Sequence, residues 1–170
     1  LYFRGEGVEQ DYGRAATFYR AAAEAGDAPA QDMLSWMLLE GEVSSPDPAE
    51  AMRWAVAAAA QGVASSMTRI GMMFHDAVGV DRDARRAAEW WAKAAERGDA
   101  DGQAMLGAAF HLGAGVPRDG VAAYALLLRA RNAGSALATP FVDAVRNTLA
   151  PHEIAEAETR AAHPLPEPQS

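Results

Sequence analysis

The chain has 170 residues, no cysteine and a net charge of −8. This length is sufficient for one domain or a short repeat array. The absence of cysteine excludes disulfides, cysteine catalysis and thiolate metal sites. Because the negative charge comes without any cluster of lysine or arginine, nucleic acid and anionic membrane surfaces are poor candidate partners. No apolar run reaches transmembrane length, so membrane insertion is not expected.

Identical residues recur every 36 positions along the chain. Four such series run in register without an insertion: Gly26, Gly62, Gly98, Gly134; Asp11, Asp47, Asp83, Asp119; Ala15, Ala51, Ala87, Ala123; and Ala22, Ala58, Ala94, Ala130. This indicates an internal repeat, which we divide into a half repeat at 1–26 and whole repeats at 27–62, 63–98 and 99–134. Abundant alanine favours helix, so each repeat is predicted to be two helices. The opening "LYFRGEGV" resembles the middle of a motif, and we expect further residues upstream.

The first helix of each repeat, helix A, follows the recurring glycine. It carries one i, i+4 apolar pair per copy: Leu34 and Leu38, Ile70 and Phe74, Leu106 and Phe110. The position between them holds Ser35, Gly71 or Gly107, and since a mid-helix glycine costs about 1 kcal/mol, a close backbone approach is expected. The loops "GEGV" at 5–8, "AVGV" at 77–80 and "GAGV" at 113–116 lack the Lys-Ser/Thr of a phosphate-binding loop and are predicted to be turns.

The second helix, helix B, is predicted to start at the recurring aspartate, which would be its N-cap, and to end at a left-handed glycine. The segment Asp47-Pro48-Ala49-Glu50 places an N-cap, an N1 proline and an N3 glutamate in order. Trp90 and Trp91 lie on either side of the line through Ala87 and Ala94. Both are expected in the core. Trp90 is expected to be the more constant core position, because its equivalents are always large and apolar, and Trp91 to face the neighbouring repeat.

Residues 135–163 depart from the repeat and are predicted to form capping helices. Thr139-Pro140 would be the N-cap and N1 of one helix, and Pro151 would open another. The last helix has a polar face, which a solenoid needs at its end. Residues 164–170 are proline-rich and are expected to be an extended tail.

The combined repeat reads A-x-[AG]-Q-x-x-L-G-x-x-F-x-x-G-x-G-V-x-x-D-x-x-x-A-x-x-W-W-x-K-A-A-E-x-G-D. This pattern resembles the Sel-one-like repeat, an α/α-repeat family that is related to tetratricopeptide repeats. The ending "LAPHEIAEAETRA" is similar to the C-terminal cap of bacterial members. The resemblance implies an all-α, right-handed α/α superhelical solenoid of antiparallel helix pairs with a C-terminal helical cap. It also implies an adaptor or scaffold role, with links to envelope assembly, signalling and host contact. The repeat at 27–62 departs from this pattern in its loop, and the repeat at 99–134 lacks both tryptophans.

In this architecture helix A lines the concave face, which gives a set of candidate partner-binding residues. They are Trp36, Met72, Asp32, Thr68, Arg69, Glu40, His75, Asp76 and His111. An exposed tryptophan beside methionine and rimmed by charges is typical of a binding hot spot, although Trp36 could instead pack under an upstream helix. His75 and His111 share one position in successive repeats, about 10 Å apart, which is too far for a common zinc ion.

We therefore predict a non-catalytic protein–protein interaction module, an adaptor or scaffold that holds a protein or peptide of some basic character in the concave groove. No catalytic residue, metal or cofactor is expected. Two alternatives stay open: a hydrolase acting on cell-wall material with its site in the groove, and a purely structural spacer of a longer chain. The partner, the oligomeric state and the compartment are not determined, with the cell envelope slightly favoured over the cytoplasm.

Overall fold

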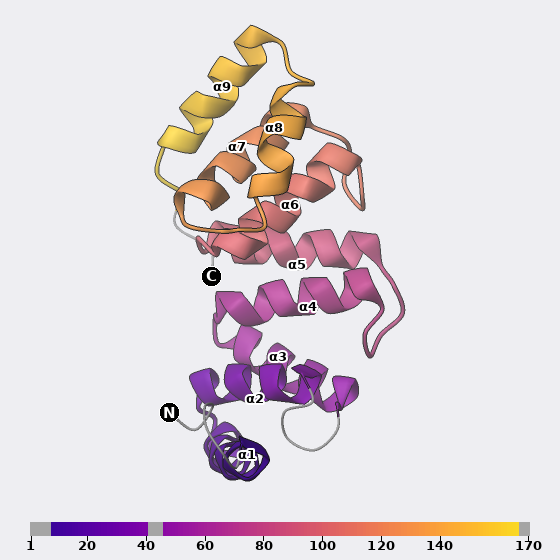
Figure 1. Cartoon of the computed structure of the whole chain (residues 1–170), viewed down its shortest axis with the longest axis vertical. Helices are drawn as coiled ribbons and strands as arrows, with labels where there is room; N and C mark the ends of the chain where they lie inside the picture. The colour runs from indigo at the N-terminus through magenta and orange to yellow at the C-terminus, as the bar shows by residue number, and fades with distance from the viewer. Residues whose placement is uncertain (1–7, 41–45, 167–170) are drawn as a thin grey trace. The chain divides into compact units, whose positions relative to one another are not determined.

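The structure is a computed structural model that describes residues 8–40 and 46–166. All regular secondary structure in these two ranges is helical, which confirms the predicted all-α class (Figure 1). The helices are α1 (Val8–Glu24), α2 (Ala28–Glu40), α3 (Pro48–Ala60), α4 (Ala64–Asp76), α5 (Ala84–Glu96), α6 (Ala100–Leu112), α7 (Gly120–Asn132), α8 (Thr139–Arg146) and α9 (Pro151–Ala162). The chain divides into two compact units, Leu1–Arg82 and Asp83–Ser170.

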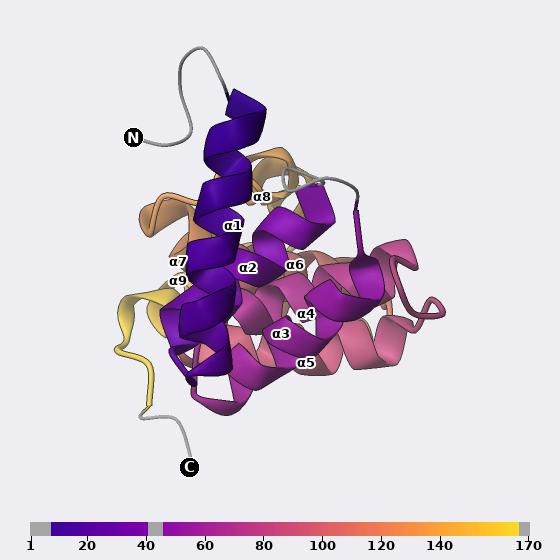
Figure 2. The ribbon, with the colours of Figure 1, turned by 90° about the horizontal axis from the view of Figure 1, so that it is seen from below.

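Within each unit, helices that are consecutive in the sequence pack on one another. In the first unit α1 packs on α2, α2 on α3, and α3 on α4; Figure 2 shows α1 alongside α2. In the second unit α5 packs on α6, α6 on α7, and α7 on both α8 and α9. Each helix thus buries its apolar side against its neighbours in the chain, as stacked helical repeats do.

The buried side of helix B is centred on a different tryptophan from the one predicted. In α5 the buried residues are Ala87, Ala88, Trp91, Ala94 and Ala95. At 100° per residue these positions form an arc centred on Trp91. Trp91 is 3% exposed, whereas Trp90 is half-buried and lies with its ring 4.4 Å from Lys93 Nζ. The predicted order was wrong because it rested on the Ala87–Ala94 line and left out Ala88 and Ala95.

Three of the recurring aspartates and all four recurring glycines have the predicted roles. The Asp47 carboxylate accepts a hydrogen bond from Glu50 N at 3.1 Å. Asp83 and Asp119 accept equivalent bonds, from Arg86 N and Ala122 N, at 3.0 Å. The glycines that follow helix B all have left-handed φ angles between 82° and 94°: Gly26, Gly62, Gly98 and Gly134.

Two predicted helix starts are corrected. Helix α1 begins at Val8, so Asp11 lies inside it rather than at its N-cap. Helix α8 begins at Thr139 and follows Ala138, so Thr139 is its first residue and not its cap. Pro151 opens α9 as predicted, and Glu153 Oε1 accepts a hydrogen bond from Ala150 N at 2.9 Å.

Small residues on helix A and in the following loop allow close packing against helix B. A Cβ on Gly107 would lie 3.1 Å from the carbonyl oxygen of Ala123 and 2.9 Å from Leu127, which confirms the expected close approach at this position. In the first repeat the equivalent residue, Ser35, donates its hydroxyl to the carbonyl of Ala51 at 2.8 Å. The loop glycine Gly115 is tighter still, since a Cβ there would lie 2.2 Å from the carbonyl oxygen of Ala84.

The glutamine of the repeat pattern joins helix A to the preceding helix B. Gln31 Nε2 donates to the carbonyl of Ala23 at 3.1 Å, and Gln103 Nε2 donates to the carbonyl of Ala95 at 3.3 Å. Both glutamines are buried. A buried amide is stable only when its polar atoms are satisfied, so this contact fixes how successive helices meet.

The C-terminal helices cover the apolar side of α7. Tyr124, Leu127 and Leu128 of α7 share a buried cluster with Val142 and Val145 of α8, and Ala157 is the one buried residue of α9. Arg129 Nη2 donates to the carbonyl of Arg160 at 2.6 Å. After Ala162 the described chain continues without helix to residue 166, and residues 167–170 of the predicted tail lie outside the described residues.

Candidate partner-binding surface

A polar network joins α2 to α4 in the first unit. Asp32 on α2 accepts hydrogen bonds from Ser65 Oγ at 3.0 Å and from Ser66 Oγ at 2.5 Å. Arg69 Nη1 forms an ion pair with Asp32 Oδ1 at 2.5 Å and also donates to the Asp32 carbonyl at 3.3 Å. The side chains of Asp32 and Arg69 are 22% and 16% exposed. These two predicted contact residues therefore bind each other and hold helices of successive repeats together.

The surroundings of Asp32 lower the pKa of its carboxyl group. Burial by itself would raise this pKa, because desolvation disfavours the carboxylate. Hydrogen bonds from Ser66, Arg69 and Ser65, together with the charge of Arg69, outweigh the desolvation and leave the pKa below its ordinary value. A general acid at neutral pH needs the opposite shift, so Asp32 suits a structural ion pair better than proton transfer.

The exposed part of the predicted surface consists of five residues on α2 and α4. Trp36 is 36% exposed, and Glu40, one turn further along α2, is exposed. On α4, Met72 is half-buried, and His75 and Asp76 are exposed, with His75 Nδ1 2.8 Å from Asp76 Oδ1. Trp36 and Met72 each follow a member of the Asp32–Arg69 pair by one turn, so they lie on the helix faces that this pair joins. We call these five residues the Trp36 surface.

Two other parts of the predicted set do not belong to this surface. Thr68 is 7% exposed, so its side chain is not available to a partner, and that part of the prediction is wrong. In the second unit the positions equivalent to Thr68 and Trp36 are Ala104 and Ala108, which are 1% and 6% exposed. His111 lies half-buried on α6 of that unit. The second unit therefore has no tryptophan at the helix A position that Trp36 holds in the first unit.

Residues 8–40 and 46–166 offer no cluster of three or more histidine or acidic side chains that could hold a metal ion. Over the same ranges, no helix is both long and apolar enough to span a bilayer.

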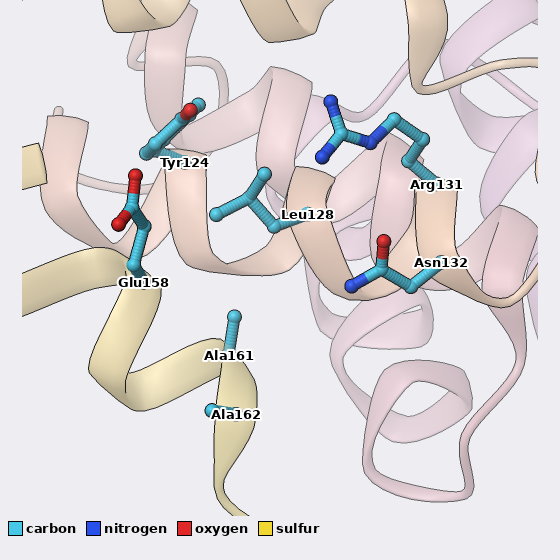
Figure 3. Close-up of a pocket in the computed structure, with 7 residues that line it drawn as sticks. All are labelled: Tyr124, Leu128, Arg131, Asn132, Glu158, Ala161 and Ala162. Atoms are coloured by element: carbon cyan, nitrogen blue, oxygen red, sulfur yellow. The ribbon is translucent and has the colours of Figure 1, made fainter.

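A second concave site, which was not predicted, lies between α7 and α9 (Figure 3). It has a volume of about 260 Å³ and is lined by Tyr124, Leu128, Arg131, Asn132, Glu158, Ala161 and Ala162. The signal available in the sequence was a departure from the repeat: the buried Ala88 and Ala95 of α5 are replaced at the equivalent positions of α7 by Tyr124 and Arg131. The cleft itself depends on how α9 packs on α7, which the repeat pattern does not describe.

Comparison with known proteins identifies the repeats. The Sel1 repeat family matches residues 1–27, 28–63, 64–99 and 100–135. No curated protein matches the chain.

Solved structures with this fold include a protective antigen present in uropathogenic Escherichia coli strains, described as displaying an SLR fold. It is similar to 95% of this chain with a TM-score of 0.83 and 31% identity, and the chain spans 35% of its length. A Sel1 repeat protein from Oxalobacter formigenes is 30% identical with a TM-score of 0.67, covering 77% of this chain and 98% of that one. Cysteine-rich protein B of Helicobacter pylori shares the fold at 22% identity, with a TM-score of 0.61 over 81% of this chain and 99% of that one.

These structures confirm the predicted solenoid of helix pairs. Sel1 repeat proteins are generally non-catalytic scaffolds that take part in protein–protein interactions. Four matched repeats cover most of the chain, and it therefore belongs to the Sel1 repeat family.

Proposed function

We propose that this protein is an interaction module that binds a protein partner through the Trp36 surface. The observation that carries the proposal is the exposure of Trp36: 36% of this large side chain remains accessible, while Leu34, Met37 and Leu38 of the same helix are at most 4% exposed. A partly exposed tryptophan supported by a packed helix is a favourable anchor for a partner side chain.

The charges around Trp36 favour a partner segment with basic residues. Glu40 and Asp76 are both exposed acids, and neither is paired with a lysine or arginine in the described part of the chain. Two arginines lie nearby: Arg69 is bound to Asp32, and Arg82 donates to the carbonyl of His75 at 3.0 Å. Neither forms an ion pair with these two acids among the described residues. Opposite charge on the partner would speed association and fix its orientation more than it would increase affinity. The proposed occupant is therefore a peptide segment with an apolar anchor residue flanked by lysine or arginine.

The Asp32 network supports binding by holding the two helices in place. Ser66 Oγ, Ser65 Oγ and Arg69 all bind one carboxylate, so α2 and α4 are joined by several contacts in the free protein. A surface that is already ordered loses less conformational entropy on binding.

The enzymatic alternative lacks support from the same residues. Asp32 has a lowered pKa and is engaged in an ion pair, and the His75 ring is next to Asp76 at an exposed site. An acid–base pair for hydrolysis needs a group whose pKa is tuned toward the working pH inside a site that excludes water. The exposed position of His75 and Asp76 offers no such exclusion.

Exposed Phe18 supplies a matched control for a binding test, because it is a large aromatic residue in the same unit but on α1, and it is 71% exposed. A photo-crosslinking residue would be placed at position 36 or position 18 of the full chain, and partners captured in the cell would be identified. For the captured partner we expect Trp36→Ala to weaken binding by about 2 kcal/mol, roughly 30-fold in Kd, and Phe18→Ala to leave Kd within about twofold. Equal capture at both positions, or equal losses in Kd, would contradict the Trp36 surface.

A role at the cell envelope or in host contact is a further part of the proposal. It is supported by the 31% identity with the protective antigen present in uropathogenic E. coli strains. Cell fractionation combined with antibody labelling of intact cells checks this directly. Recovery of the protein only in the cytoplasmic fraction would rule the envelope role out.

A further inference from the structure

The cleft between α7 and α9 lies in the second unit and is separate from the Trp36 surface. We infer that it binds the C-terminal residue of a peptide that ends in lysine or arginine. The carboxylate would bind to Arg131 and Asn132, and the cationic side chain would bind to Glu158 and Tyr124.

The cleft lies where α9, which follows the last repeat, packs on α7. In α5 the residues equivalent to Tyr124 and Arg131 are Ala88 and Ala95, which are 1% and 4% exposed. The repeat packs with alanine at both positions in α5, so it does not require a tyrosine or an arginine there. In α7 the tyrosine and the arginine both line the cleft. The polar groups of this site thus distinguish the repeat at 99–134 from the repeat at 63–98.

Four polar groups in the cleft are not used by the fold. The Tyr124 hydroxyl, the Arg131 guanidinium, the Asn132 amide and the Glu158 carboxylate make no hydrogen bond or ion pair with the part of the chain that the structure describes. Tyr124 is 4% exposed, yet no fully buried side-chain oxygen or nitrogen among the described residues lacks a partner. Because Tyr124 also lines the cleft, we place its accessible surface there.

The groups are sorted by chemistry along the cleft. Figure 3 shows Tyr124 and Glu158 at one end, Arg131 and Asn132 at the other, and Leu128 between them, with Ala161 and Ala162 on the α9 side. Arg131 follows Tyr124 by seven positions of α7, a rise of about 10 Å between their Cα atoms. One end therefore favours a cation and the other an anion, with an aliphatic surface in between.

The end of α7 still suits a carboxylate, although a helix C-terminus carries about half a negative charge. Arg129 and Arg131 both lie in the last turn of α7, and their two full positive charges exceed this partial charge. Arg131 and Asn132 can each donate hydrogen bonds to a carboxylate, and the planar guanidinium can do so with two nitrogens.

The size of the cleft restricts the ligand to one residue. Its volume of about 260 Å³ is below the usual range for sites that enclose a drug-sized ligand, about 300–1,000 Å³. Lysine carries its ammonium on a flexible four-carbon stem, which can lie over Leu128 while the two charged ends reach opposite sides of the site. Arginine offers the same combination of a cation, an apolar stem and, at a chain end, a carboxylate.

The test uses the full chain and fluorescein-labelled hexapeptides that differ only at the C-terminal residue, with fluorescence polarisation as the readout. The probes end in lysine, in lysine amide, or in norleucine. We expect the lysine acid to bind at least tenfold more tightly than either the amide or the norleucine peptide. No binding of the lysine acid at millimolar concentration, or equal binding of all three probes, would overturn the inference.

Two variants separate the two ends of the site. Glu158→Gln should remove the preference for lysine over norleucine and keep the preference for acid over amide, whereas Arg131→Gln should do the reverse. Glu156→Gln is the matched control, because Glu156 is an exposed glutamate on the same helix that does not line the cleft. Unchanged circular dichroism confirms that each variant is folded. If Glu156→Gln lost the preference for lysine over norleucine and the preference for acid over amide to the same extent as the two cleft variants, the assignment would also be refuted. Trp36→Ala should leave all these values unchanged, so failure of this inference is distinguishable from failure of the proposed function.

Discussion

Replacing Asp32 by alanine should destabilise the first unit. The change removes the acceptor for Ser65, Ser66 and Arg69 and leaves the guanidinium, which is 16% exposed, without its counter-ion. Removing one partner of a fully buried ion pair costs about 3–5 kcal/mol, and loss of a neutral hydrogen bond costs about 1 kcal/mol. Because both charged side chains keep some contact with water, we expect a loss of about 2–4 kcal/mol in the free energy of unfolding.

The second unit contains a matched control. Asp101 accepts a hydrogen bond from Ser135 Oγ at 2.7 Å and is exposed, and no arginine of the described ranges is bound to it. Asp101→Ala should therefore cost about 1 kcal/mol. Urea unfolding followed by circular dichroism measures both variants. A loss below about 0.5 kcal/mol for Asp32→Ala, or equal losses for the two variants, would refute the view that Asp32 and Arg69 fix α2 against α4.

The same ion pair gives a pH dependence with a defined sign. The folded state lowers the pKa of Asp32 below the ordinary value of an aspartate, so the stabilisation is complete above the unfolded pKa and is lost as the pH falls through the folded pKa. Unfolding measured between pH 7 and pH 2 should show Asp32→Asn approaching the wild type only below about pH 4. A constant difference across this range would show that the carboxylate charge is not what matters.

Two further pairs of substitutions test the packing of the repeat. Gly115→Ala should lower the free energy of unfolding by about 3 kcal/mol or more, because the new Cβ would lie 2.2 Å from the carbonyl oxygen of Ala84. Gly134→Ala should lower it by about 1 kcal/mol, because Gly134 also has a left-handed φ but has no atom within 4 Å of the new Cβ. Similar losses for the two variants in thermal unfolding would mean that backbone strain alone explains both. Trp91→Ala should lower the free energy of unfolding by about 3–5 kcal/mol and Trp90→Ala by about half as much, because Trp91 is 3% exposed and Trp90 is half-buried. Urea midpoints in the opposite order would show that Trp90 is the core position.

Much of the fold could be predicted because the repeat presents local signals several times. The caps Asp47, Asp83 and Asp119 and the left-handed glycines depend only on neighbouring residues, so one pattern serves every copy. The small position at Gly107 was also predictable, since a glycine inside a helix needs a reason in the packing. Local chemistry and periodicity thus determined the helices, their ends and the family.

Burial and pairing required the tertiary structure, because they depend on residues far apart in the sequence. The two tryptophans of the "WW" pair were ranked in the wrong order, since the buried face of α5 depends on how α5 packs on its neighbour α6. Asp32 and Arg69 were predicted to meet a partner, and they bind each other across 37 positions of the chain. The cleft between α7 and α9 depends on how the capping helix packs on α7. The sequence alone determined the repeat; which side chains it leaves free for partners was decided by how the helices pack, because that packing joins residues far apart in the sequence.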